Sequence, residues 1–222
     1  MKRILCYGDS NTWGFDAIHK DSLTGLPARF DEHTRWPGVM RDILGEQYFV
    51  WEAGIGGRTT VFDDPLMPTR NGAKDFELLL QICDPVDCII FALGTNDTKD
   101  MFQASPLVIC RGMERLLNVC KSVLLQSRSP NAKIILACPI IPVADGSGEY
   151  WYGFSKLSTE KGEELRDRYK ILAREQNCFF MDLNNFGKPS AADGVHMESD
   201  SHKRVGEAMA QLVQAVMKDQ KN

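Results

Sequence analysis

The stretch RILCYGDSNT, residues 3–12, sets a pattern that the rest of the chain repeats. Its first five residues form a short, nearly continuous apolar run, and small polar residues follow without a break. Apolar runs of this length, bounded by a turn signal, are typical of strands that are buried on both faces of a parallel sheet. The stretch therefore predicts a buried strand that ends in a polar turn.

Four more apolar runs, rich in Ile, Val, Phe and Cys, are expected to be strands at 48–52, 87–93, 132–138 and 178–183. Between them, apolar residues recur three and four positions apart within 76–83, 110–124, 165–172 and 205–216, which is the period of an amphipathic helix. This alternation predicts a three-layer α/β/α doubly wound fold, of the flavodoxin-like kind, around a five-stranded parallel sheet. Thr34, just before Trp36-Pro37, is expected to cap the start of another helix.

The 222 residues are long enough to bury a full core, and we expect a single domain over 1–222. The sequence contains no linker, internal repeat or low-complexity tract. Two longer irregular stretches, 19–33 and 140–160, interrupt the pattern. Long loops in a compact domain are usually functional or disordered. The second stretch carries Trp151, Tyr152 and Phe154, which favours a functional loop.

Composition narrows the classes of function. Apolar residues make up 43% and charged residues 25%, the balance of an ordinary soluble protein. The net charge of −4 argues against binding to nucleic acid or to an anionic membrane, and so favours a small-molecule partner. Seven cysteines, an odd number lying mostly within apolar runs, indicate buried thiols in a reducing compartment. The apolar run at 4–7 is too short for a signal peptide or a membrane span, so we expect a cytoplasmic protein.

Small and polar residues follow the predicted strands, at the edge of the sheet where such folds bind ligands. These segments are GDSNT at 8–12, GIGGRT at 54–59, GTND at 94–97, Pro139 with Pro142, and DGVH at 193–196.

These segments contain the residue types that acyl transfer needs. A serine hydroxyl becomes a nucleophile when a base takes its proton, another group orients that base and donors hold the developing oxyanion. Ser10 can be the nucleophile, His196 the base and Asp193 its partner. The Ser10 amide, an amide of the glycine turn and the Asn96 side chain can be the donors.

Each of these residues, taken alone, also has an ordinary structural interpretation. Ser10 and Asn96 can be cap or turn residues, and Asp182 at the end of the fifth strand competes with Asp193 as partner of the histidine. Asp9 and Asp97 are expected to bond nearby amides. The remaining histidines are expected at the surface or in loops: His19, His33 and His202.

Other classes of function fit less well. Thr59 stands where a dinucleotide-binding fingerprint needs glycine, and neither a P-loop nor a Gly-x-Ser-x-Gly elbow occurs. The acidic residues and histidines of 193–202 are typical of a solvated loop that leads into a helix. We therefore expect no metal and no cofactor. A non-catalytic module that binds an acylated sugar remains an alternative.

The segments at 8–14, 54–57, 94–97 and 193–196 resemble, in order, the first, second, third and fifth blocks of the SGNH (GDSL-type) hydrolases. More narrowly, the chain resembles the arylesterase/acyltransferase subgroup. The shared motifs are KRILC at 2–6, RTT at 58–60, DDP at 63–65, NG at 71–72 and GTNDTK at 94–99.

The resemblance implies a serine esterase that hydrolyses short-chain, acetyl-type esters through an acyl-enzyme and also transfers acyl groups to alcohols. Ser10, His196 and Asp193 would be catalytic, and Ser10, Gly57 and Asn96 would form the oxyanion hole, with Gly56 as the alternative to Gly57. The subgroup also implies homo-oligomers around a narrow apolar acyl pocket. Candidate pocket residues are Trp13, Phe15 and Lys99, together with Trp151 and Phe154 of the long loop. A carbohydrate acetylesterase is the alternative within the same class.

Overall fold

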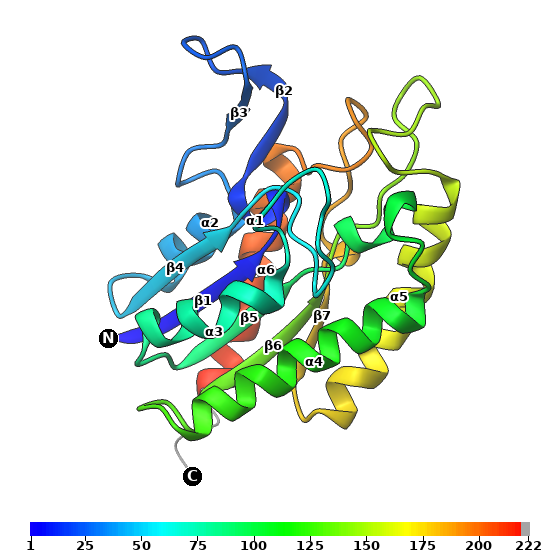
Figure 1. The fold of residues 1–222 in the computed structure, drawn as a ribbon. Coiled ribbons are helices and arrows are strands. Elements are labelled where there is room, and N and C mark those ends of the chain that lie inside the picture. The colour runs from blue at the N-terminus through cyan, green and yellow to red at the C-terminus, as the bar shows by residue number, and fades with distance from the viewer. Residues whose placement is uncertain (219–222) are drawn as a thin grey trace.

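The computed structural model describes residues 1–218 and confirms the predicted α/β fold. Five parallel strands form one sheet in the order β4 (Tyr48–Gly54), β1 (Lys2–Gly8), β5 (Cys88–Ala92), β6 (Lys133–Cys138) and β7 (Phe179–Asp182) (Figure 1). Because all five strands point the same way, their carboxyl ends meet at one edge of the sheet. The order reverses between β1 and β5, which is the switch point where such sheets bind ligands.

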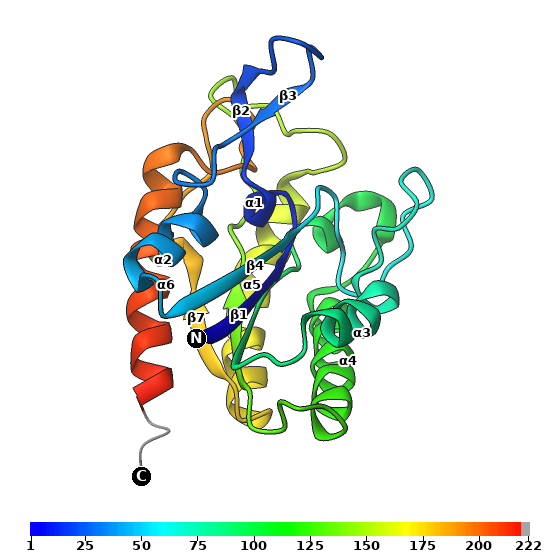
Figure 2. The same ribbon diagram turned by 90° about the vertical axis from the view of Figure 1, so that its left-hand side faces the viewer.

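The sheet is covered on both faces, as continuous apolar strands require. Alternate residues of a strand point to opposite faces. Leu5 and Tyr7 accordingly pack on one side with α3 (Gly72–Cys83), α4 (Pro106–Leu125) and α5 (Lys156–Glu175). Ile4 and Cys6 pack on the other side with α2 (Trp36–Leu44) and α6 (Ser199–Lys218). Figure 2 shows α2 and α6 on one side of the sheet and α3 and α4 on the other.

The stretch at 19–33, expected to be irregular, contains part of a small hairpin. β2 (Phe15–Lys20) pairs antiparallel with β3 (Pro27–Arg29) and projects beyond the sheet (Figure 1). Most side chains of this arm are exposed, so it lacks the regular apolar alternation by which a strand is predicted. Residues 140–155 form no helix or strand, as expected, and α5 begins at Lys156.

Two smaller expectations were wrong. The residue that caps α2 is Arg35, and the Thr34 hydroxyl instead donates a 2.9 Å hydrogen bond to the Asp31 carboxylate. His202, expected at the surface, is fully buried in α6. His202 faces α2. The sequence around it did not indicate this, because a surface histidine near the start of a helix has the same local pattern.

The cysteines behave as small apolar residues. Six of the seven are buried, Cys178 is half-buried and none forms a disulfide. Burial raises the pKa of the Cys6 and Cys88 thiols, which keeps them protonated. Within residues 1–218, no helix is both long enough and apolar enough to cross a membrane.

His202 joins the two helices on its side of the sheet. Its Nδ1 accepts a 3.2 Å hydrogen bond from the backbone amide of Trp36, at the start of α2, and the Phe30 ring meets it edge-on. Burial, and secondarily the nearby His196, lower the pKa of His202 from 6.5 to about 3. The folded protein therefore holds this imidazole neutral at pH values where the unfolded chain protonates it.

We predict that this difference weakens the fold in mild acid. The contribution of the neutral His202 to the free energy of unfolding is fully present above about pH 6.5. As the pH falls toward about 3, it is lost at about 1.4 kcal/mol per pH unit. His202→Asn keeps an acceptor for the Trp36 amide and removes the titration. Between about pH 7.5 and about pH 5, the wild type should lose roughly 2 kcal/mol more than the variant in urea unfolding. Equal losses in the two proteins would contradict this account.

Candidate active site

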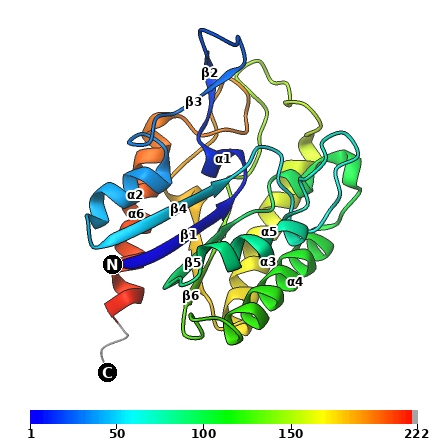
Figure 3. The same ribbon diagram turned by 60° about the vertical axis from the view of Figure 1, so that its left-hand side comes forward.

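The predicted site residues come from segments that lie far apart in the chain and meet at the carboxyl edge of the sheet. The short helix α1 (Ser10–Trp13) begins directly after β1 and carries Ser10 as its first residue. Figure 3 shows α1 beyond the ends of β1 and β4. Asn96 opens the 3₁₀ turn η1 (Asn96–Thr98) after β5, and His196 lies between η3 (Leu183–Asn185) and α6.

Two glycines allow α1 to lie this close to the sheet. Gly8 and Gly54 are paired at the ends of β1 and β4. A Cβ on Gly8 would come within 2.0 Å of the Thr12 hydroxyl oxygen, and one on Gly54 within 2.2 Å of the Trp13 backbone nitrogen. Any other residue at these positions would push α1, and Ser10 with it, away from the strand ends.

Ser10, His196 and Asp193 form a continuous hydrogen-bonded chain. Ser10 Oγ lies 2.9 Å from His196 Nε2, and His196 Nδ1 lies 2.5 Å from Asp193 Oδ2. The other Asp193 oxygen accepts hydrogen bonds of 2.9 Å from the backbone amides of Val195 and His196. All three side chains are buried. Asp182, the competing candidate, instead pairs with Arg166 and Asn184 and does not contact His196.

A tight turn at Gly194 shapes the loop that presents His196. Gly194 has a φ of +69°, a conformation that is strained for other residues. A Cβ there would lie 2.0 Å from the Val143 carbonyl oxygen. The Gly194 carbonyl also accepts a 2.8 Å hydrogen bond from the Val143 amide, which joins this loop to the stretch at 140–160.

The electrostatics keep Asp193 ionised. Burial would raise the pKa of this carboxyl, but the hydrogen bonds and charge of His196 and the two backbone amides outweigh it, and the pKa lies below its ordinary value. An ionised carboxylate beside Nδ1 holds the ring with its Nε2 toward Ser10. It also stabilises the positive imidazolium that forms when Nε2 takes up a proton.

Besides the Ser10 amide, the candidate oxyanion donors come from Asn96 and from the glycine turn. Asn96 Nδ2 donates a 3.1 Å hydrogen bond to the Arg58 carbonyl, which places its carboxamide beside the glycine turn. In that turn the Arg58 amide donates to the Ile55 carbonyl, and Gly57 has a φ of +80°. A Cβ on Gly56 would lie 4.0 Å from Ser10 Cβ. Both glycines thus lie in a turn next to Ser10, and Gly56 remains the alternative donor.

Two buried carboxyl groups hold the segment after the glycine turn and the start of α1. Asp97 accepts hydrogen bonds from both the backbone amide and the hydroxyl of Thr60, and Asp9 accepts one from the Asn11 amide, as the sequence predicted. Burial raises the pKa of Asp97 to about 6 and that of Asp9 to about 7.

Arg58 was singled out in the sequence only as part of a motif. Its guanidinium lies over the Tyr7 ring and donates hydrogen bonds to the carbonyls of Gly8 and Ala53, at 2.7 and 2.5 Å. It therefore ties the glycine turn to the ends of β1 and β4. Neither carbonyl could be identified as its partner from the sequence, because both partners depend on how the strands pair.

The candidate pocket residues fall into two groups. Phe15 and Trp151 enclose the His196 imidazole. The Phe15 ring stacks on it with centroids 3.9 Å apart, and Trp151 meets it edge-on at 4.9 Å.

The other three lie beside different partners. Trp13 lies under the Arg29 guanidinium of β3, at 5.0 Å. The Lys99 ammonium lies over the ring of the buried Phe154, at 5.3 Å. Phe15 and Trp151 are thus the two candidates that contact the predicted base.

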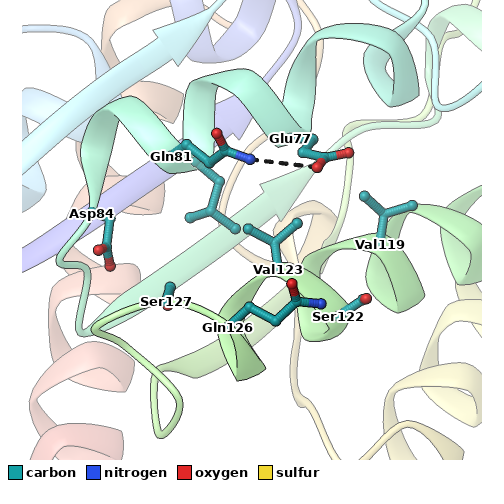
Figure 4. Close-up of a pocket in the computed structure, with 9 residues that line it drawn as sticks. Glu77, Gln81, Asp84, Val119, Ser122, Val123, Gln126 and Ser127 are labelled. Atoms are coloured by element: carbon teal, nitrogen blue, oxygen red, sulfur yellow. Dashed lines mark hydrogen bonds between the residues drawn. The ribbon is translucent and has the colours of Figure 1, made fainter.

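A groove of about 430 Å³ between α3 and α4 lies elsewhere (Figure 4). Its lining residues include Asp84 and Ser127, just beyond the carboxyl ends of the two helices, and none of the predicted site residues. Helices of this fold run antiparallel to the strands. The groove therefore opens toward the edge of the sheet opposite Ser10.

Comparison with known proteins shows which family the chain resembles in sequence and in fold. Residues 6–204 match the model of the GDSL-like lipase/acylhydrolase family. The structure of an aryl esterase from M. smegmatis is 32% identical, with a TM-score of 0.84 over 97% of this chain and 99% of that one. A carbohydrate acetylesterase from Sinorhizobium meliloti is 31% identical, with a TM-score of 0.85 over 97% and 100% of the two chains.

An acetylxylan esterase of Xylanibacter ruminicola is 25% identical over 228 residues, which are 95% of this chain. They are 43% of that protein, so the chain spans less than half the length of this curated relative.

The fold is that of the SGNH hydrolases, a class of carboxylic ester hydrolases. Within that class, the chain belongs to the GDSL-like lipase/acylhydrolase family. This confirms the family that the sequence motifs predicted.

Proposed function

We propose that the protein is a serine esterase that hydrolyses short-chain, acetyl-type esters through an acyl-enzyme. The observation that carries this proposal is the continuous chain of contacts from Ser10 Oγ through His196 to Asp193. Such a chain joins a nucleophile, a base and the group that orients the base, which is the minimal set for acyl transfer.

The proposed mechanism assigns a role to each side chain. As Ser10 Oγ attacks the ester carbonyl carbon, His196 Nε2 takes the hydroxyl proton, and Asp193 stabilises the imidazolium. The oxyanion accepts hydrogen bonds from Asn96 and from the amides of Ser10 and Gly57; one such donor is worth about 3–4 kcal/mol of barrier. Collapse of this intermediate breaks the bond to the alcohol, which takes the proton from His196. A water, activated by His196 in the same way, then releases the acid and restores Ser10.

The two aromatic rings beside His196 support a short acyl group and transfer to alcohols. Phe15 and Trp151 pack against His196, which narrows the site beside the imidazole and reduces the access of water to it. A site that excludes water favours an alcohol as the second acceptor when one is present.

The second candidate substrate is an acetylated carbohydrate. Two of the similar proteins are named for such esters, and the exposed rings near His196 favour the same class. Trp151 is 39% and Tyr152 71% exposed, and flat exposed rings can stack on a sugar. An acetylated xylo-oligosaccharide hydrolysed with a higher kcat/KM than p-nitrophenyl acetate would favour this candidate.

Replacing Ser10 tests the proposed nucleophile. Ser10→Ala should lower kcat for p-nitrophenyl acetate by ~10⁴-fold or more, with the thermal unfolding curve preserved. A fluorophosphonate should add one covalent adduct to the wild type and none to the variant, as measured by mass spectrometry.

The matched control is Ser147→Ala, which removes an exposed hydroxyl and should change neither result. A Ser10→Ala protein that keeps its esterase activity would end the proposal. A wild type that stays unlabelled would favour a non-catalytic binding module.

Substrate length and acceptor can be tested together. With p-nitrophenyl esters from acetyl to octanoyl, kcat/KM should be highest for acetyl and fall with each added length, because the aromatic rings beside His196 narrow the site. Trp151→Ala should shift this preference toward longer chains. Added alcohol should divert part of the product from free acid to ester, measured by chromatography. A flat preference in the wild type would exclude the proposed role of these rings.

We also propose that the chain forms homo-oligomers. Large apolar side chains of the β2–β3 arm are exposed, with Leu23 94% and Leu26 64% accessible, and exposed apolar surface of this kind marks contact sites. Light scattering should give a mass that is a multiple of the 25.0 kDa chain. Leu23→Asp, which places a charge on that surface, should lower the mass. A monomer in the wild type would refute this proposal.

A further inference from the structure

Asn11, the residue after Ser10, makes two hydrogen bonds to the backbone on either side of His196. Its Oδ1 accepts from the Met197 amide at 2.9 Å, and its Nδ2 donates to the Val195 carbonyl at 3.2 Å. The Asn11 side chain is buried, and 184 and 186 residues of sequence separate it from these partners. The carboxamide thus pairs with the peptide groups that flank the proposed base.

Asn11 joins two parts of the structure, α1 and the loop around His196, and each part is held by hydrogen bonds of its own. On one side, the Asp9 carboxylate accepts the Asn11 amide and fixes the first turn of α1, which carries Ser10. On the other side, the His196 loop is held by its own bonds, from the His196 amide to the Asp193 carboxylate and from the Ser190 amide to the His196 carbonyl. Across the described chain, residues 1–218, three hydrogen bonds join α1 to this loop: two from Asn11, and that between Ser10 and His196.

We propose that Asn11 is a positioning residue for the reaction, which sets the distance between His196 Nε2 and Ser10 Oγ. This inference rests on the proposed esterase function. A serine hydroxyl rotates freely about χ1, so its single bond to His196 cannot by itself hold the loop in register. One bond on each side of His196 restrains both shift and rotation of that loop, and small misplacements of reacting groups cost large factors in rate.

The family signature that gives GDSL its name has leucine at this position, and this chain has asparagine. A leucine side chain has neither a donor nor an acceptor, so it can make neither bond. The pair of hydrogen bonds made by the Asn11 side chain therefore depends on a residue in which this chain differs from that signature. Asn11→Leu keeps the branching and the number of side-chain heavy atoms and removes both hydrogen bonds, although its two methyl groups take up more space than the carboxamide.

The test compares Asn11→Leu with a matched control. Asn184 forms the same pattern around Ile140: its Oδ1 accepts from the Ile141 amide at 3.0 Å and its Nδ2 donates to the Pro139 carbonyl at 2.9 Å. Asn184→Leu removes the equivalent pair of bonds, together with the Asn184 bond to Asp182, at a side chain that does not bond to the His196 loop. Where Asn11→Leu fails to fold, Asn11→Ala replaces it, since the space left admits a water that pairs with both backbone groups.

The expected result separates positioning from a structural role. Asn11→Leu should lower kcat for p-nitrophenyl acetate by roughly 10- to 100-fold with little change in KM, and slow fluorophosphonate labelling by a similar factor. The downfield proton signal of the His196–Asp193 hydrogen bond should persist in NMR spectra, because that bond lies within one loop. Asn184→Leu should keep the wild-type kcat and labelling rate.

Other outcomes overturn the inference. If Asn11→Leu lowers only the unfolding temperature and retains kcat and the labelling rate, Asn11 is structural and the proposal fails while the esterase function stands. If Asn11→Leu lowers kcat and also loses the downfield signal, the His196 loop itself has been disrupted. Asn11 then does not act by setting the distance between His196 and Ser10. If the wild type neither hydrolyses the ester nor is labelled, the proposed function fails, and the role of Asn11 fails with it.

Discussion

The close packing of α1 against the ends of β1 and β4 is the constraint on which the site depends. Gly8 and Gly54 are paired in register, and only the absence of both Cβ atoms lets the helix turn directly over the strand ends. The hydroxyl of Ser10 then lies at the shared edge of the sheet, within hydrogen-bond distance of a histidine that is distant in sequence. The carboxyl edge of a parallel sheet supplies the other segments, because every strand ends there.

Buried polar groups hold these segments at that edge. The carboxylates of Asp9, Asp97 and Asp193 each accept backbone amides of a neighbouring turn, and the Arg58 guanidinium binds the carbonyls at two strand ends. Buried groups of this kind are costly when unpaired and directional when paired. Each turn is therefore restrained to one conformation, as a catalytic constellation requires.

Much of the fold was predictable because the strands are buried on both faces. Their continuous apolar runs place β1 and β4 within two residues of their observed bounds. The β2–β3 arm was not predicted, since its exposed side chains follow no apolar period. His202 was misplaced for a related reason: its neighbours in sequence are polar, and its burial comes from α2, which packs on it from elsewhere in the chain.

The sequence by itself determined the α/β fold, the family and the residue types at the strand ends, because these follow from local patterns of apolar runs and short motifs. Only the tertiary structure decided which partners meet. It pairs His196 with Asp193 rather than Asp182, stacks Phe15 on the imidazole and places Trp151 edge-on to it, and joins Asn11 to the peptides around His196. Except for His196 and Asp193, which lie three residues apart, these contacts link residues that are distant in sequence. They depend on how the elements pack and on where each loop turns, and a local sequence pattern contains neither.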